Sequence, residues 1–294
     1  MSRIEILKTY KIYIGGQFPR TESGRYYVAK NKKGQALANV CLSSRKDVRD
    51  AVVSARNAVG GWSGRAAFNR SQILYRIAEM LEGRRAQFID ELIKQDSSAK
   101  DAETEVNLSI DRLIYYAGWC DKYQQVFSAV NPVASSHFNF SVPEPTGVVS
   151  IVAAQNTALL GLVSVIAPAI AGGNTCVVLA SEDKPLCSVT FAEVINSSDV
   201  PGGVINILTG KPSELVKYFA NHMDINAVVY CENDTATKKL IQEKASLNVK
   251  RVLFYDTINW KNDEGQSPYF ITDTQEIKTT WHPIETVGSA KAGY

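Results

Sequence analysis

The sequence predicts an α/β protein built on a doubly wound, mostly parallel sheet, with additional N-terminal helices and a small β flap. Three observations predict this fold class. Residues 147–256 alternate short apolar runs with helical patterns. Residues 44–127 carry apolar positions at helical spacing. Residues 128–146 instead alternate apolar and polar positions between prolines, as a β-hairpin does.

The composition is that of an ordinary globular protein. The 294 residues are 45% hydrophobic and 21% charged, with a formal net charge of +2. So small a charge argues against a nucleic-acid partner. The five cysteines and three histidines show no metal-ligand spacing, so we predict reduced thiols and no metal site. We find no signal-peptide pattern and no apolar run long enough to span a bilayer, and therefore expect a cytoplasmic protein with no membrane partner.

The N-terminal part is predicted to form short strands and then helices. Residues 12–18 alternate around Gly15-Gly16, as a hairpin does. Ser44 is a suitable N-cap for a helix that we expect to end at Gly60-Gly61. Further amphipathic helices are expected at the following ranges: 69–82, 85–95 and 100–127.

The region from residue 147 to residue 256 gives the clearest pattern. The predicted strands are 147–153, 175–179, 204–208, 227–230 and 251–255, and the helices between them are 159–171, 186–195, 213–220 and 235–245. Repeated strand–helix–strand units imply right-handed crossovers, and therefore a five-stranded parallel sheet with helices on both faces. We expect a loop over 257–268, one or two strands over 269–283 that end in Trp281, and a mobile tail.

Three sequence motifs carry a family resemblance. Residues 147–156 read GVVSIVAAQN, residues 167–175 read APAIAGGNT, and residues 200–210 read VPGGVINILTG. Together they resemble the aldehyde dehydrogenase superfamily, which implies a Rossmann-like, NAD-binding type of domain. The chain is most similar to the degenerate second half of the tandem aldehyde dehydrogenases of family 16. That half lacks the catalytic cysteine and ends with a strand similar to KTTWHP at 278–283.

The resemblance also implies that a domain is missing. In the family, a catalytic domain with the nucleophilic cysteine lies between the cofactor-binding half and the C-terminal strand. Here those parts resemble residues 10–252 and 276–283, and only residues 253–275 lie between them. The last cysteine, Cys231, precedes that interval. We therefore expect the chain to lack the catalytic cysteine.

The resemblance assigns further positions to the family's site. Asn156 falls on the asparagine that stabilises the oxyanion, and Tyr255 falls on the general-base glutamate, so that base is expected to be missing. Leu179 falls on the lysine that binds adenosine, and Glu232 on a glycine close to the pyrophosphate. Both changes disfavour NAD, because one removes a charged donor and the other adds a carboxylate beside two phosphates.

Asn156, Glu182 and Gly210 are the positions that would remain of a cofactor site. Each also has a purely structural interpretation, since Asn156 suits a strand-to-helix turn and Glu182 suits a solvated loop. Cys231 is open to two interpretations, a reactive thiol at a helix start or a small buried residue. We predict no catalytic residue, with Asn156 as an oxyanion relic, and no cofactor beyond weak NAD binding.

The elements through which family members assemble are retained. The resemblance divides the chain into a Rossmann-like domain (1–127 and 147–262) and an oligomerisation flap (128–146 and 263–294). Phe138, Phe140, Ile277 and Trp281 are the predicted interface residues. The alternative for this cluster is an ordinary hairpin packed on its own core.

These features together predict a non-catalytic, aldehyde-dehydrogenase-like subunit for assembly or regulation. Its expected partner is a catalytic aldehyde dehydrogenase chain or a second copy of itself. Two alternatives stay open. One is an NAD-dependent aldehyde oxidoreductase that borrows a partner's cysteine or uses Cys231, and the other is a nucleotide-binding sensor.

Overall fold

The computed structural model describes residues 6–284, and its centre is a parallel sheet in the order β10-β9-β6-β7-β8. The strands are β6 (Val148–Val152), β7 (Thr175–Leu179), β8 (Ile205–Leu208), β9 (Ala227–Tyr230) and β10 (Arg251–Phe254). All five predicted strands are present, and their ends lie within one residue of the expected positions. Every residue of β6, β7, β8 and β9 is buried, as expected for parallel strands that are covered on both faces.

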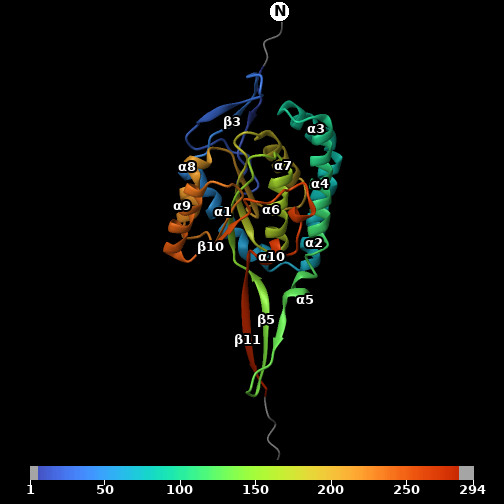
Figure 1. Ribbon diagram of the computed structural model, residues 1–294, viewed down its shortest axis with the longest axis vertical. Coiled ribbons are helices and arrows are strands. Elements are labelled where there is room, and N and C mark those ends of the chain that lie inside the picture. The colour runs from blue at the N-terminus through green and yellow to red at the C-terminus, as the bar shows by residue number, and fades with distance from the viewer. Residues whose placement is uncertain (1–5, 285–294) are drawn as a thin grey trace, which may run out of the picture.

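Helices cover both faces of this sheet (Figure 1). They are α1 (Arg45–Ser63), α2 (Ala67–Gly83), α3 (Arg85–Lys94), α4 (Ala99–Ala117), α6 (Leu160–Ala171), α7 (Leu186–Asn196), α8 (Pro212–Asn221) and α9 (Thr235–Ala245). Val149 and Ile151 pack in the core with α2, α4, α6 and α7. The alternate residues Val148 and Val152 pack with α1, α8 and α9 on the other face. The doubly wound fold is therefore confirmed.

The first helix is longer than its glycines predict. α1 runs through Gly60 and Gly61 and ends at Ser63, with Gly64 as its C-cap, so the end that we expected at Gly60-Gly61 is wrong. A glycine costs a helix only about 1 kcal/mol relative to alanine. Trp62 lies one residue beyond the pair, is 1% exposed, and donates its indole N–H to the Ile170 carbonyl at 3.0 Å. Burial of this large side chain outweighs the cost of the two glycines.

The predicted helix over 100–127 is interrupted. α4 ends at Ala117, the chain turns through Gly118, and a short α5 (Tyr123–Phe127) follows. The turn allows Cys120 and Tyr123 to be buried beside the end of α6, where the Tyr123 hydroxyl donates to the Gly172 carbonyl at 3.4 Å. The interruption therefore results from tertiary packing that helical periodicity does not report.

The structure of residues 269–274 also differs from the predicted strand. Residues expected as strand form a helical turn, α10 (Tyr269–Thr272), that begins after Pro268. Ile271 is fully buried in the core around α6. Residues 269–274 therefore belong to the main body, although the predicted flap boundary at residue 263 places them outside it. The strand β11 (Gln275–Pro283) extends past Trp281, and the tail predicted to be mobile lies outside the described residues from 285 onward.

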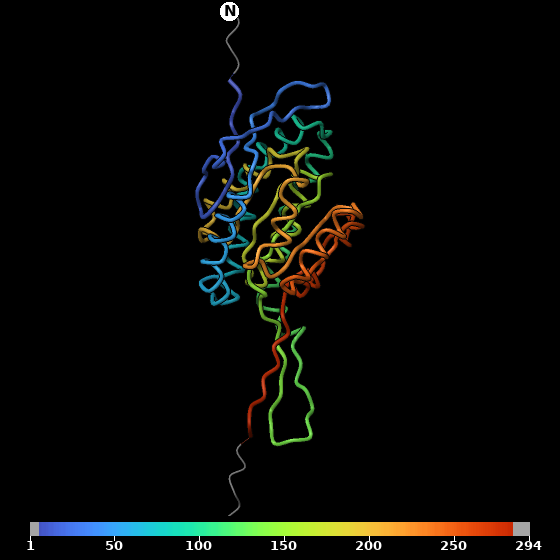
Figure 2. Tube along the Cα trace, turned by 90° about the vertical axis from the view of Figure 1, so that its left-hand side faces the viewer, coloured from blue at the N-terminus to red at the C-terminus, as the bar shows by residue number. Residues whose placement is uncertain are grey.

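A second, three-stranded sheet projects from the body, and we call it the outer sheet (Figure 2). It is antiparallel, in the order β11-β5-β4, and contains β4 (Ala129–Asn131) and β5 (His137–Pro145) besides β11. β11 pairs with β5 along its whole length, from Gln275 opposite Pro145 to Pro283 opposite His137. The two-stranded excursion predicted at 128–146 is thus present, with the C-terminal strand as its third member.

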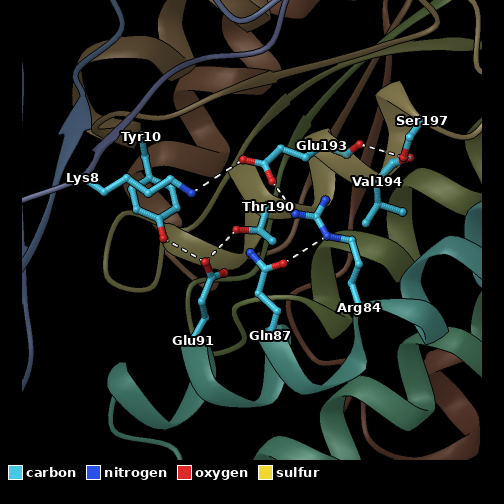
Figure 3. A network of polar contacts seen from close by, with 9 residues as sticks. All are labelled: Lys8, Tyr10, Arg84, Gln87, Glu91, Thr190, Glu193, Val194 and Ser197. Carbon is cyan, nitrogen blue, oxygen red and sulfur yellow. Dashed lines mark hydrogen bonds and ion pairs between the residues drawn. The ribbon is translucent and has the colours of Figure 1, made fainter.

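A small N-terminal sheet closes the other end of the molecule. Its strands are β1 (Thr9–Tyr10), β2 (Tyr26–Lys30) and β3 (Ala36–Cys41), and the turn predicted at Gly15-Gly16 has positive φ at both glycines. The Tyr10 and Thr190 hydroxyls both donate to Glu91 Oε1 at 2.8 Å, which joins β1 to α3 and α7 (Figure 3). Burial raises the pKa of the Glu91 carboxyl.

Candidate functional site

The candidate site lies at the carboxyl edge of the parallel sheet, between β6 and β9. β6 stands in the middle of the strand order, and the chain continues from it to β7 and β8 on one side and later returns to β9 on the other. In doubly wound sheets, ligands bind in the crevice where the strand order reverses. The segments at this edge are 153–157 after β6, 180–184 after β7 and 231–234 after β9.

The N-terminus of α6 is occupied by a carboxylate of the chain itself. Glu105 of α4 is 4% exposed, and its Oε1 accepts backbone hydrogen bonds from Ala158, Leu159 and Leu160 at 2.9, 2.8 and 3.2 Å. These N–H groups lie at the start of α6 and just before it, at the end of the helix that carries a partial positive charge. Glu105 therefore supplies the anion that a ligand phosphate would otherwise supply.

The N-terminus of α9 is capped in a similar way. Asp234 accepts backbone hydrogen bonds from Ala236 at 3.3 Å and from Thr237 at 3.0 Å. The hydrogen bond from the Thr237 hydroxyl, together with these backbone contacts, holds the pKa of the Asp234 carboxyl below its usual range. Both helix N-termini that flank the reversal point thus carry negative charge from the protein, which opposes the binding of an anionic ligand.

Gln155 connects all three strand ends. Its backbone N–H donates to Glu232 Oε1 at 2.6 Å, and its side-chain oxygen accepts from the Glu182 backbone N–H at 2.7 Å. The Ser181 hydroxyl donates to the Gln155 carbonyl at 3.0 Å, and the Gln155 amide donates to the Ala153 carbonyl at 2.9 Å. The segment after β6 is therefore tied to the segments after β7 and β9 by three hydrogen bonds.

These residues do not fit a dinucleotide. Leu179 is fully buried in the core between the sheet and α1, so it presents no donor at the edge. Glu232 and Asp234 place two carboxylates beside the helix end where a pyrophosphate would lie. Glu182 keeps the position that the resemblance assigns to ribose binding, and partial burial raises the pKa of its carboxyl. Its backbone is already committed to Gln155 and to the Tyr27 hydroxyl.

Asn156 follows Gln155 and is exposed. Its backbone carbonyl accepts from Lys184 Nζ at 3.2 Å. This contact joins the turn between β6 and α6 to the segment after β7 through the backbone of Asn156.

Tyr255, at the position assigned to the general base, is half-buried and packs against the core. Its hydroxyl donates to Asp273 Oδ2 at 2.7 Å, and its ring packs against Phe270 with centroids 4.9 Å apart. Asp256 instead forms an ion pair with Lys238 of α9. The two side chains therefore have different partners, since consecutive residues at a strand end face opposite ways.

Gly210 has a structural reason for being glycine. Its φ is 153°, and a Cβ there would lie 3.2 Å from the Ser43 backbone nitrogen and 3.2 Å from Leu215 Cδ1. The residue thus lets the end of β8 approach the segment that leads into α1.

All five cysteines are buried, as the structural interpretation of Cys231 requires. Burial raises the pKa of the Cys120 thiol to about 12 and that of the Cys231 thiol further still. Thiolates are the nucleophilic form, so these side chains are poor nucleophiles at neutral pH. Among the described residues, no group of three or more His, Cys, Asp or Glu side chains could hold a metal ion.

The predicted interface residues lie on two opposite faces of the outer sheet. Phe138 and Phe140 share one face with His282, whose ring stacks on Phe140 at 6.3 Å. Trp281 lies on the other face against His137, with ring centroids 5.8 Å apart, and Ile277 shares that face. Phe138, Ile277 and Trp281 are all exposed, at 48, 59 and 56%.

The sequence interpretation missed Gln155, Glu105 and Asp234. Asp234 carried a local signal, because an aspartate before a helical pattern is a typical N-cap. No local sequence pattern indicated the role of Glu105, because its hydrogen-bond partners lie more than fifty residues away in the sequence. Glu232 was identified as a replacement, but its hydrogen bond to Gln155 follows only from the strand order.

Comparisons with known proteins agree with this architecture. The model of the aldehyde dehydrogenase family matches residues 18–277. The chain is 32% identical to the cytosolic 10-formyltetrahydrofolate dehydrogenase of Xenopus tropicalis over 83% of its own length and 28% of that protein. It is 31% identical to the DhaS protein of Bacillus subtilis, over 83% of the chain and 50% of the relative. It therefore spans half or less of these relatives.

Solved structures give the same result. The NAD⁺ complex of aldehyde dehydrogenase from Bacillus cereus superposes with a TM-score of 0.77 at 25% identity, over 84% of this chain and 50% of that one. The structure of PnpE from Pseudomonas sp. WBC-3 gives a TM-score of 0.79, also at 25% identity, over 85% of this chain and 50% of that chain. The residues described here contain no helix that is both long and apolar enough to cross a membrane. On the family match, the fold and the strand order together, the chain belongs to the aldehyde dehydrogenase family.

Proposed function

We propose that this chain is a non-catalytic member of its family, an assembly or regulatory subunit that contacts its partner through the outer sheet. The observation that carries the proposal is the bridge of Gln155 between Glu182 and Glu232, together with the capped N-termini of α6 and α9. A crevice closed by hydrogen bonds and lined with carboxylates is unsuited to a dinucleotide.

The thiols support the same proposal. An aldehyde dehydrogenase of the usual kind needs an accessible cysteine thiolate. Cys231, the cysteine nearest to the candidate site, is 5% exposed, and burial raises the pKa of its thiol. These properties count against the alternative in which Cys231 attacks the substrate.

The outer sheet supports the assembly part of the proposal. It projects from the body (Figure 2) and exposes apolar side chains on both faces. Exposed strand edges and exposed apolar side chains are features through which proteins pair. A catalytic aldehyde dehydrogenase and a second copy of this chain are the two partners that we consider. We also propose a cytoplasmic location, in line with the printed name of the Xenopus relative.

An activity and capture experiment tests this proposal. The purified chain would be assayed for NADH formation with short and long aldehydes, alone and after co-expression with catalytic aldehyde dehydrogenases of its own proteome. The proposal expects no turnover by the chain alone, and a stable complex with itself or with a catalytic chain. Turnover by the chain alone that a Cys231→Ser variant abolishes would overturn it.

The nucleotide-sensor alternative is tested with the same preparation. A nucleotide at 100 times its dissociation constant would raise the free energy of unfolding by about 2.7 kcal/mol. Stabilisation of this size by NAD, ADP-ribose or AMP would favour the sensor over the assembly subunit.

A further inference from the structure

A groove of about 630 Å³ lies between α1 and α8, and it is separate from the candidate site. Its walls are the first turns of α1 on one side and, on the other, the end of α8 with the residues that follow it. None of the residues that line it belongs to the three segments at the carboxyl edge of the sheet. A groove of this volume suits a small molecule.

The α1 wall of the groove carries a cluster of cations. These are Arg45, Lys46 and Arg49, and all three are exposed. Arg45 and Arg49 are four residues apart, so they lie on the same face of the helix. Lys46 and Arg49 form ion pairs with the exposed carboxylates of Glu22 and Asp50, whereas Arg45 forms none within residues 6–284. Exposed ion pairs are weak, so these side chains are available to a more highly charged anion.

Tyr218 of α8 positions two cations at this end of the groove. The guanidinium carbon of Arg45 lies 5.8 Å from the Tyr218 ring centroid, and Lys217 Nζ lies 5.0 Å from it. Such contacts hold a cation in place without neutralising its charge. Lys217, like Arg45, has no ion pair in the part of the chain that the structure describes. The ring therefore supports positive charge and is not free to stack on a nucleotide base.

The other end of the groove offers hydrogen-bonding groups of both kinds. His222 Nδ1 accepts from the Asp224 backbone N–H at 3.2 Å, and burial lowers the pKa of the His222 ring. A neutral imidazole that accepts at Nδ1 carries its proton on Nε2, so His222 has an N–H to donate. Asn221 adds a side-chain amide, and the exposed carboxylate of Asp224 is an acceptor. This end suits hydroxyl groups, because a hydroxyl both donates and accepts.

We propose that this groove, which we call the α1–α8 groove, binds a sugar phosphate. The phosphate lies at Arg45 and Arg49, because guanidinium groups bind phosphate oxygens in pairs. The sugar hydroxyls lie at His222 and Asp224. Asp224 repels a bare anion, so the groove favours a ligand that carries its charge at one end only. The inference goes beyond the proposed function, because this site depends neither on the outer sheet nor on the loss of catalysis.

Calorimetric titration of the full chain with glucose 6-phosphate and with ribose 5-phosphate tests the site. At least one of them should bind with a dissociation constant below about 1 mM at low salt, and glucose and ribose should not bind. Arg45→Glu should weaken this binding at least about tenfold. The variant should stay folded, because a carboxylate in the first turn of a helix is favourable. Lys100→Glu, an equal change of charge in the first turn of α4, is the matched control and should change the affinity less than about twofold.

Inorganic phosphate and an Asp224→Asn variant test the hydroxyl end of the groove. The sugar phosphate should bind the wild-type chain at least about tenfold more tightly than inorganic phosphate does, because only the sugar reaches His222 and Asp224. Asp224→Asn removes both a repulsive charge and an acceptor of hydroxyl groups. The ratio of the two affinities should therefore fall toward one in this variant. Equal affinities of the wild-type chain for the two ligands would overturn the proposed ligand class.

Other results would also overturn the inference. The wild-type chain could bind neither sugar phosphate, or Arg45→Glu and Lys100→Glu could weaken binding equally, which would make net charge the cause. Binding that survives Arg45→Glu would lie outside the α1–α8 groove. Tighter binding of AMP than of either sugar phosphate, abolished by Arg45→Glu, would make the ligand a nucleotide. None of these results bears on the proposed function, which aldehyde turnover and complex formation test separately.

Discussion

The Gln155 backbone N–H donates to Glu232 Oε1 at 2.6 Å, across the boundary between β6 and β9 where the strand order reverses. Doubly wound proteins bind their ligands at this position. Here a glutamate stands where the family resemblance expects a glycine, and the protein uses it to join two strand ends. The carboxylate of Glu232 thus disfavours a ligand phosphate, and its hydrogen bond to Gln155 holds the crevice closed.

Replacing Glu232 is expected to destabilise the protein. Glu232→Ala leaves the Gln155 N–H without its acceptor, and we expect a loss of about 1–2 kcal/mol in the free energy of unfolding, measured with urea. Glu243→Ala is the matched control. Glu243 is exposed and its ion pair with Lys239 is long, at 3.9 Å, so the free energy of unfolding should change by no more than about 0.5 kcal/mol. Equal effects of the two changes would show that the Gln155–Glu232 contact contributes little.

Glu105 is expected to contribute more than any surface carboxylate. Glu105→Ala leaves three buried N–H groups at and just before the start of α6 without an acceptor and should cost about 3 kcal/mol or more. Glu105→Gln keeps an acceptor oxygen and should cost less. Glu103→Gln, on the exposed side of the same helix, should change stability by less than about 1 kcal/mol. A small loss for Glu105→Ala would contradict its role as the cap of α6.

The cysteines are expected to be inert in the folded protein. A thiol-specific disulfide reagent such as DTNB at pH 8 should label none of the five within minutes, and all five after unfolding in guanidinium chloride. The reason is burial, which also raises the pKa of the Cys120 and Cys231 thiols. Rapid labelling of Cys231 in the native protein would contradict this prediction and would favour the enzyme alternative.

Stability is expected to depend on pH through Lys250. Burial lowers the pKa of its amine from 10.5 to about 8, and its Nζ donates to the His222 carbonyl. Between pH 8 and 10.5 the unfolded chain holds a proton that the folded chain has released, so this residue makes stability rise with pH. The unfolding free energy of Lys250→Met minus that of the wild type should therefore fall from pH 7 to pH 10, because the wild type gains stability over this range and the variant lacks the amine. A constant difference would contradict the lowered pKa.

The parallel sheet could be predicted from sequence because its strands are buried on both faces. Runs such as 175–179 and 227–230 are wholly apolar or nearly so, and each is followed by a helical pattern. The end of α1 could not be predicted, because Trp62 is buried against α6, which follows a hundred residues later. α10 could not be predicted either, because a run as short as its four residues fits a strand or a helical turn equally well.

The candidate site was predictable only in part. Leu179 and Glu232 stood out because they depart from the family's motifs, but Gln155 did not. Its bridging role depends on β9 lying next to β6, which is a long-range pairing. The division of Phe138 and Trp281 between two faces follows from the β5–β11 register, and a sequence does not specify register between strands so far apart.

Calorimetric titration of the full chain with NAD tests the central claim most directly. The account predicts no saturable heat up to millimolar NAD, because Glu232 and Asp234 stand at the phosphate position and Gln155 closes the crevice. Glu232→Gly, measured in parallel, reopens part of that position and is the variant in which weak binding could appear. Saturable binding of NAD to the wild-type chain with a micromolar dissociation constant would contradict the account.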